Sequence, residues 1–134
     1  MYRKTYTGFI VWFILYLLVG VGSAFVLPNF DEASYTRLLM NLTTIAMAIL
    51  TFIIWRTEYV YWYNGVSYED AEKAGSERRR RYGYFHFQLF LKVALAGLAY
   101  TALSILAGFP WWLDLPVFGV GLITAAFWTM KYKL

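Results

Sequence analysis

Apolar residues gather in four long runs that short polar segments separate. A hydrocarbon layer about 30 Å thick needs roughly 20 helical residues to cross it, and the four runs meet or nearly meet that length. Polar and apolar residues do not alternate along the runs, which argues against a transmembrane barrel, so helices must satisfy the backbone in lipid. The sequence therefore predicts an all-α polytopic membrane protein, a single transmembrane domain over residues 1–134, with spans at 8–27, 37–57, 86–107 and 112–130.

The connections between the runs predict how the spans are joined. Short turns at 28–32 and 108–110 predict two antiparallel hairpins, the first span with the second and the third with the fourth. The connection at 58–85 is longer and is the one sizeable aqueous portion. Within it, Ser67 stands three residues before Asp70, a spacing typical of a capping box. We therefore expect a short helix that begins at about Ser67 and runs on into the third span.

The distribution of cations predicts the orientation. Of the 12 Lys and Arg, ten flank span ends or lie in the central connection on one side, Arg37 alone lies on the other side, and Lys92 lies in the third span. Asp31, Glu32 and Asp114 accompany Arg37 on that other side. Because positive residues mark the cytoplasmic side, we expect both termini and the central connection in the cytoplasm. The expected location is the plasma or inner membrane.

Composition agrees with a protein in lipid rather than in water. Hydrophobic residues make up 60% and aromatic residues 22% of the chain, and the mean hydropathy is +0.50, beyond the usual range of a soluble domain. The N-terminal run at 8–27 is longer than the apolar region of a signal peptide, so we expect it to be a permanent span. The flanks of the spans explain the net charge of +4, so no nucleic-acid partner is expected.

Residues that carry chemistry are scarce. The chain has one histidine, His86, and no cysteine, and we expect no carboxylate in the interior of a span. A catalytic dyad, a triad or a metal site needs several such groups at matched spacing. We therefore expect no enzyme activity, no metal site and no cofactor.

Two stripes of small or weakly polar residues run along the second and third spans. Their members are three, four or seven residues apart, so each stripe shares one helix face. Such a face lets another helix approach closely, within the chain, in a homo-oligomer or from a partner membrane protein. The alternative is a groove or pathway for a lipid or solute. The stripes consist of Asn41, Thr44 and Thr51 in the second span and of Ala94, Gly97, Thr101 and Ser104 in the third.

The cations next to the third span exceed what orientation needs. Four adjacent arginines stand directly before an aromatic stretch, and a lysine follows inside the span. Cations near the surface attract anionic headgroups at about 1 kcal/mol each, and a guanidinium can hold a phosphate with two parallel hydrogen bonds. The simpler alternative is an orientation signal with a lysine that extends to the surface. The predicted lipid-headgroup site consists of Arg56, Arg78, Arg79, Arg80, Arg81 and Lys92.

The chain combines a short length and two predicted hairpins with basic or aromatic stretches at 3–9 and 85–90 and a span that ends at 127–132. This layout resembles the GtrA-like family of small four-helix membrane proteins. That family is associated with moving polyprenyl-phosphate-linked sugars across membranes, so the resemblance implies such a lipid as partner. The family usually carries an Asn before the basic residue at a span end, where this chain has Trp55 and Met130.

Two functions are compatible with these patterns. The first is a small non-enzymatic membrane module, an accessory subunit or a homo-oligomer, whose cytoplasmic face binds anionic membrane lipids. The second is a translocator of a lipid-linked sugar or of a small solute. The first is favoured because the faces for helix packing are clear, whereas ionisable groups inside the spans are almost absent.

Overall fold

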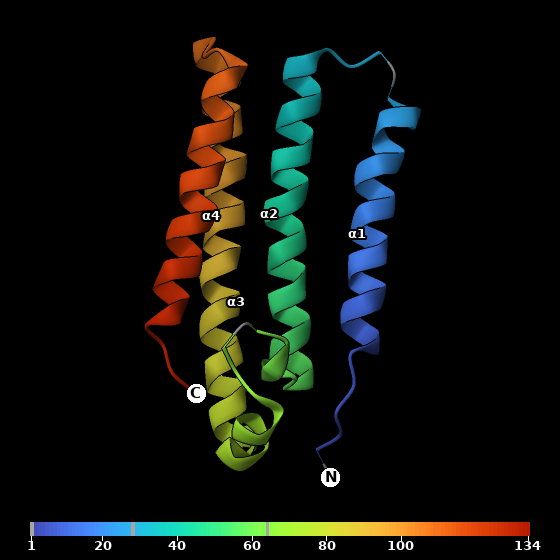
Figure 1. Cartoon of the computed structure of the whole chain (residues 1–134). Coiled ribbons are helices and arrows are strands. Elements are labelled where there is room, and N and C mark those ends of the chain that lie inside the picture. The colour runs from blue at the N-terminus through green and yellow to red at the C-terminus, as the bar shows by residue number, and fades with distance from the viewer. Residues whose placement is uncertain (1, 28, 64) are drawn as a thin grey trace.

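The computed structural model describes residues 2–27, 29–63 and 65–134 (Figure 1). These residues form helices and contain no strand, and four of the helices are long and apolar enough to cross a membrane. The predicted all-α class is therefore confirmed, and the four apolar helices indicate a membrane protein. The elements are α1 (Thr7–Val26), α2 (Glu32–Thr57), η1 (Val60–Trp62), α3 (Tyr68–Ala107), η2 (Trp111–Leu113) and α4 (Asp114–Met130).

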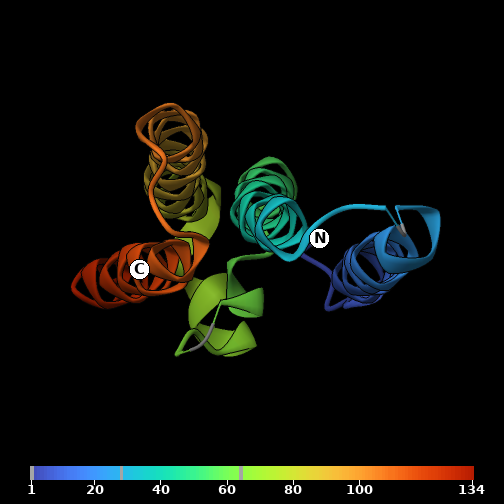
Figure 2. The same cartoon turned by 90° about the horizontal axis from the view of Figure 1, so that it is seen from above.

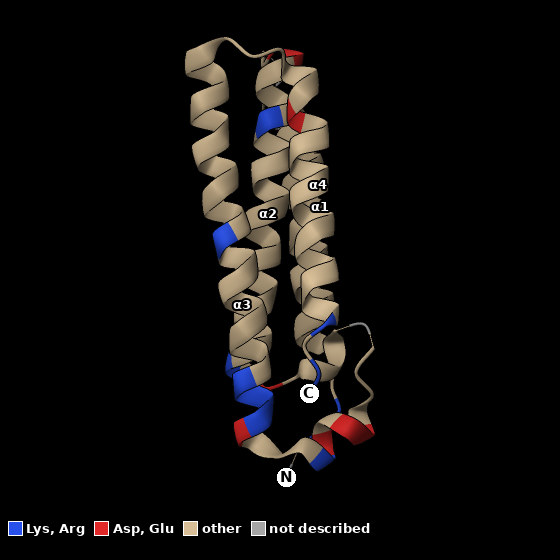
Figure 3. Cartoon of the chain, turned by 90° about the vertical axis from the view of Figure 1, so that its left-hand side faces the viewer, with Lys and Arg blue, Asp and Glu red and all other residues tan. Residues whose placement is uncertain are grey.

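Helices α2, α3 and α4 pack together, whereas α1 stands on the far side of α2 (Figures 1 and 2). The most extensive helix contact joins α2 to α3, not the two members of either predicted hairpin. Both termini lie at the same end of the bundle (Figure 1). Lysine and arginine gather at this end (Figure 3), which we call the basic end.

The contact between α2 and α3 depends on a glycine. A β-carbon at Gly83 would lie 2.9 Å from the Cα of Trp55, so a larger residue would force the two backbones apart. Buried apolar residues form two clusters, one beside this contact and one further along the spans. The first contains Leu50, Ile54, Val60, Tyr61, Ala71 and Tyr82, and the second contains Ala48, Phe90, Ala94 and Ala125.

Helix α3 is longer than a span requires. Its 40 residues exceed the roughly 20 that cross the hydrocarbon layer. The helix begins after Ser67, whose hydroxyl accepts a hydrogen bond of 3.0 Å from the amide of Asp70. It changes direction at Gly75, whose φ of 77° lies in the region that favours glycine. The turns of α3 before Gly75 pack on η1, and this contact buries Ala71 of α3 completely.

Helix α1 contacts the bundle through few side chains. The indole nitrogen of Trp12 donates a hydrogen bond of 3.0 Å to the carbonyl of Ala46. The hydroxyls of Tyr16 and Thr43 lie 2.9 Å apart. No residue in the most apolar stretch of α1 is buried inside the fold. In a bilayer, most of this helix would therefore face lipid.

The segment before α1 fastens this helix at the basic end. We call residues 2–6 the N-terminal strap. The carbonyl of Thr5 accepts a hydrogen bond of 2.7 Å from the hydroxyl of Tyr61, which belongs to η1. The hydroxyl of Tyr2 donates to the carbonyl of Glu58 at 2.7 Å. The strap thus ties α1 to the end of α2 and to η1.

Candidate functional site

The two predicted stripes meet inside the bundle. The side-chain amide of Asn41 donates a hydrogen bond of 2.7 Å to the hydroxyl of Thr101, which joins α2 to α3. A β-carbon at Gly97 would lie 2.7 Å from the ring of Phe118, so α4 packs directly on this glycine. Both stripes thus serve packing within one chain, and their role as a pathway stays a prediction. The other stripe residues, Thr44, Thr51, Ala94 and Ser104, are buried.

At the end opposite the basic end, the stripes lead to a buried ion pair. The Nε of Arg37 lies 2.8 Å from Oδ2 of Asp114, whose side chain is fully buried. Ser104 donates to Oδ1 of the same carboxylate at 3.0 Å. The Nη2 of Arg37 also donates to the carbonyl of Phe109 at 3.1 Å. Each carboxylate oxygen therefore has a donor, as a buried charge requires.

The sequence contains a signal for this pair that the predictions did not use. Arg37 stands four residues before Asn41 and seven before Thr44, so it continues the polar face of α2. Asp114 is the first residue of α4, shortly after the small stripe ends at Ser104. Asp114 is buried at the end of an apolar helix, a position that the expectation of no carboxylate in the interior of a span did not cover.

The adjacent arginines of the predicted headgroup site have different environments. Arg79 points into the fold, where its Nη2 lies 2.9 Å from the carboxylate of Glu58 and its guanidinium lies 4.0 Å above the ring of Tyr2. Arg80 pairs with the same carboxylate through Nε at 2.8 Å, but its side chain is 67% exposed. Arg79 therefore stabilises the strap, whereas Arg80 is open to a ligand.

Glu58 joins these groups. Its φ of 64° lies in a region that residues other than glycine rarely adopt. Its carboxylate accepts hydrogen bonds from Ser76 at 2.7 Å, from Arg79 at 2.9 Å and from Arg80 at 2.8 Å. Burial raises the pKa of Glu58, but these hydrogen bonds outweigh burial and leave the pKa below its ordinary value. The carboxylate is therefore charged at neutral pH.

Arg56 and Arg80 line an open hollow of about 230 Å³ together with Trp55. We call it the Arg56 hollow. The ring of Trp55 stacks on Phe87 with 5.4 Å between centroids and contacts Phe52 at 5.8 Å. An aromatic surface thus continues from the hollow along α2 and α3. Among the described residues, Arg56 forms no ion pair.

The remaining predicted cations lie elsewhere. Arg78 and Arg81 line a second hollow, of about 190 Å³, with the segment that follows α4. Lys92 follows Arg81 by 11 residues, which is about 16 Å along the helix, and it lines neither hollow. The structure therefore brings Arg56 together with Arg80 and brings Arg78 together with Arg81, but it leaves Lys92 apart.

His86 is a packed core residue. Its ring centroid lies 4.3 Å from the ring centroids of both Tyr63 and Tyr82. Its Nδ1 lies 2.9 Å from the carbonyl oxygen of Tyr82. Within residues 2–27, 29–63 and 65–134, no three His, Cys, Asp or Glu side chains gather as metal ligands. The groups that the structure brings together at the Arg56 hollow are cations and aromatic rings.

Comparison of the chain with protein-family models, with curated proteins and with solved structures finds no match. The resemblance to the GtrA-like family stays a prediction from the layout.

Proposed function

We propose that the chain is a non-enzymatic integral membrane protein that binds anionic lipid headgroups through the Arg56 hollow. The main support for this proposal is that Arg56 of α2 and Arg80 of α3 line the same open hollow. Arg80 uses only its Nε toward Glu58, so both of its Nη groups remain as donors. Two guanidinium groups suit a phosphate, which accepts parallel hydrogen bonds from each.

The depth of the hollow supports this proposal. About 20 residues, or 30 Å, counted back from Ala107 put the inner edge of the hydrocarbon layer near Gln88. Trp55 packs on Gly83, five residues beyond that edge, which is about 7 Å. Each headgroup region is about 5 to 8 Å deep. Arg56 would therefore lie at the depth of the lipid phosphates rather than of the acyl chains. The backbone of Arg80 is eight residues, about 12 Å, beyond the same edge, so its side chain would approach the phosphate from the aqueous side.

The aromatic surface beside the hollow suits the rest of a lipid. Phe52 is 42% exposed and lies one helix turn from Trp55, toward the middle of the bundle. Aromatic rings are typical of the interface between headgroups and hydrocarbon. A lipid whose phosphate binds Arg56 and Arg80 would lay its acyl chains along these rings. The arginines therefore supply charge recognition, and the rings supply apolar contact.

We infer that the basic end faces the cytoplasm, in the plasma or inner membrane. The excess of cations at this end supports the orientation, and anionic lipids in the cytoplasmic leaflet would attract the same cations. The stripes on α2 and α3 pack within the chain, so assembly with a second copy or with a partner membrane protein would use another face. Helix α1 offers the most open face because none of its most apolar stretch is buried.

Translocation of a polyprenyl-phosphate-linked sugar or of a small solute is the second candidate function. It would begin with the same headgroup contact, but it also needs a path across the bilayer. The polar side chains in the core bond across helices in the pairs of Asn41 with Thr101 and of Arg37 with Asp114. The buried hydroxyls of Thr44 and Thr51 instead donate to carbonyls of their own helix. We therefore propose binding rather than passage.

Retention of phosphatidylglycerol in native mass spectrometry tests this proposal. The variant R56Q/R80Q should lose most of the bound lipid, and R56K/R80K should recover only part of it because lysine cannot form the bidentate contact. The matched control is R3Q/K73Q, which removes two exposed cations outside the hollow. Lys92→Leu should also retain the lipid. Equal retention by R56Q/R80Q and by the control would reject the proposal.

A further inference from the structure

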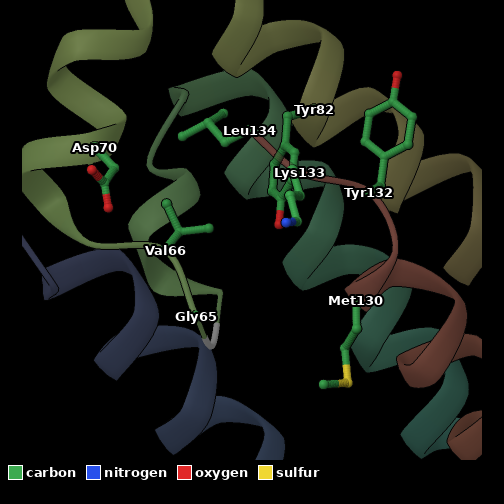
Figure 4. Close-up of a pocket in the computed structure, with 8 residues that line it drawn as sticks. All are labelled: Gly65, Val66, Asp70, Tyr82, Met130, Tyr132, Lys133 and Leu134. Carbon is green, nitrogen blue, oxygen red and sulfur yellow. The ribbon is translucent and has the colours of Figure 1, made fainter.

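A larger cavity opens at the basic end and shares no residue with the Arg56 hollow. Its volume is about 360 Å³, and its walls come from the loop at 65–66, from Asp70, from Tyr82 and from the segment that follows α4 (Figure 4). We call it the Tyr82 cavity. A volume of this size is within the range of small-molecule sites.

Cations stand at one side of the Tyr82 cavity. The cavity shares Tyr82, Tyr132 and Lys133 with the adjoining hollow, which Arg78 and Arg81 also line. Arg78 and Arg81 are three residues apart, so they share a face of α3. Among the described residues, neither arginine nor Lys133 forms an ion pair. These three cations around the cavity and its adjoining hollow exceed the one carboxylate on the wall, that of Asp70, so together they attract an anion.

The remaining walls of the cavity suit an organic group. The ring of Tyr82 is buried, and Val66 and Met130 add apolar surface. Asp70 stands on the wall opposite Met130 (Figure 4). The hydroxyl of Ser67 donates to Oδ2 of Asp70 at 2.7 Å, so Oδ1 remains to accept a hydrogen bond from a ligand. The cavity therefore combines apolar surface, one acceptor and a cationic rim.

The geometry points to a second binding site, for a small molecule that joins a phosphate to an aromatic or similar ring. The phosphate binds Arg78, Arg81 and Lys133, and the ring lies against Tyr82. The same phosphate chemistry could come from a soluble molecule or from a lipid headgroup. The loop at 65–66 and the first turns of α3 form part of the wall and lie outside the hydrocarbon layer, which favours the soluble source. This site is independent of the Arg56 hollow.

Calorimetric titration of the full chain in phosphatidylcholine nanodiscs tests this inference, with phenyl phosphate and inorganic phosphate as probes. Phenyl phosphate should bind, and R78Q/R81Q should weaken its binding about tenfold or more because charge-assisted hydrogen bonds are lost. Val66→Phe narrows the apolar part of the Tyr82 cavity, where the phenyl ring would lie. It should therefore weaken the binding of phenyl phosphate but not of inorganic phosphate. Circular dichroism should show the helix content of the wild type in both variants.

Several outcomes separate this inference from its alternatives. Phenyl phosphate binding should be unchanged in R56Q/R80Q, which keeps a failure here distinct from a failure of the lipid site. No binding of phenyl phosphate by the folded wild type, or equal binding by R78Q/R81Q, would overturn the inference. Nanodiscs that contain phosphatidic acid provide the lipid arm. If only phosphatidic acid binds in a manner that R78Q/R81Q abolishes, the ligand is a lipid and the soluble source is wrong.

Discussion

Among single residues, Glu58 connects three parts of the basic end. Its backbone conformation is costly for a residue with a side chain, so the surrounding contacts must offset that cost. Its carboxylate binds Arg79 and Arg80 of α3, and its carbonyl binds Tyr2 of the strap. The same residue ends α2. The loss of its charge should therefore weaken the attachment of both α1 and α3 at the basic end.

We predict that Glu58→Gln destabilises the fold. The substitution leaves Arg79 buried without a carboxylate, and removal of one partner of a buried pair costs about 3 kcal/mol. Chemical unfolding in detergent measures this loss. Glu77→Gln is the matched control because Glu77 is exposed and forms no ion pair with a described residue. Equal stability of the two variants would show that this ion pair does not hold the strap.

The lowered pKa of Glu58 also predicts that the stability of the fold depends on pH. Its pKa lies below the ordinary value of 4.5, so its ion pairs contribute fully above pH 4.5. The contribution is lost as the pH falls through the lower pKa of the folded protein. Wild type should therefore lose more thermal stability than Glu58→Gln as the pH is lowered from about 5 to below 4.5. Parallel melting curves for the two proteins across this interval would contradict the assignment.

At the scale of helices, the apolar runs predicted the spans closely, whereas the helix expected from about Ser67 into the third span was predicted from the capping-box spacing of Ser67 and Asp70. The predicted third span at 86–107 covers only the second half of α3 (Tyr68–Ala107). Apolar runs reveal which helical segments cross the bilayer, because the side chains that face the acyl chains are apolar. The first half of α3 is polar, and contacts between Ala71 and η1 help to hold it. Such contacts join segments that are distant in sequence, so the pattern of one helix does not reveal them.

The candidate site was predictable in composition but not in arrangement. Four adjacent arginines are equivalent in the sequence, yet successive helical side chains turn by about 100°, so Arg79 faces inward while Arg80 faces outward. Arg80 and Arg56 line the same hollow because Gly83 lets α3 pack closely on α2. No local sequence pattern specifies this contact between helices. The position of Asp114, in contrast, was predictable, because the sequence places it shortly after Ser104, where the stripe of the third span ends.

Helix packing provides a further prediction. Gly97→Leu should lower the free energy of unfolding by about 1 to 3 kcal/mol because the new side chain must displace Phe118. Gly119→Leu is the matched control, since nothing lies within 4 Å of a β-carbon at Gly119 and this residue does not line the hollow beside Gly97. Unfolding in detergent measures both variants. Equal tolerance would mean that α4 does not pack on Gly97 as described.

At the scale of the whole molecule, the excess of cations at the basic end predicts a topology that can be tested by chemical labelling. The sequence contains no cysteine, so a single introduced cysteine is a unique label. In intact cells, a membrane-impermeant maleimide should label Phe109→Cys and should spare Lys73→Cys until the cytoplasm is opened. Both positions are exposed in the structure. Labelling of Lys73→Cys from outside would reverse the proposed orientation of the basic end.

In the proposed lipid site, the phosphate lies between Arg56 and Arg80 in the bilayer. Solid-state NMR can measure the distance from the lipid ³¹P to the ¹³Cζ of each arginine in phosphatidylglycerol bilayers, with R56K and R80K to assign the signals. A bidentate contact puts these nuclei about 4 Å apart. We expect this distance for Arg56 and Arg80 and no such contact for the buried Arg79. Phosphorus close to Arg79, or remote from both Arg56 and Arg80, would contradict the proposed lipid site.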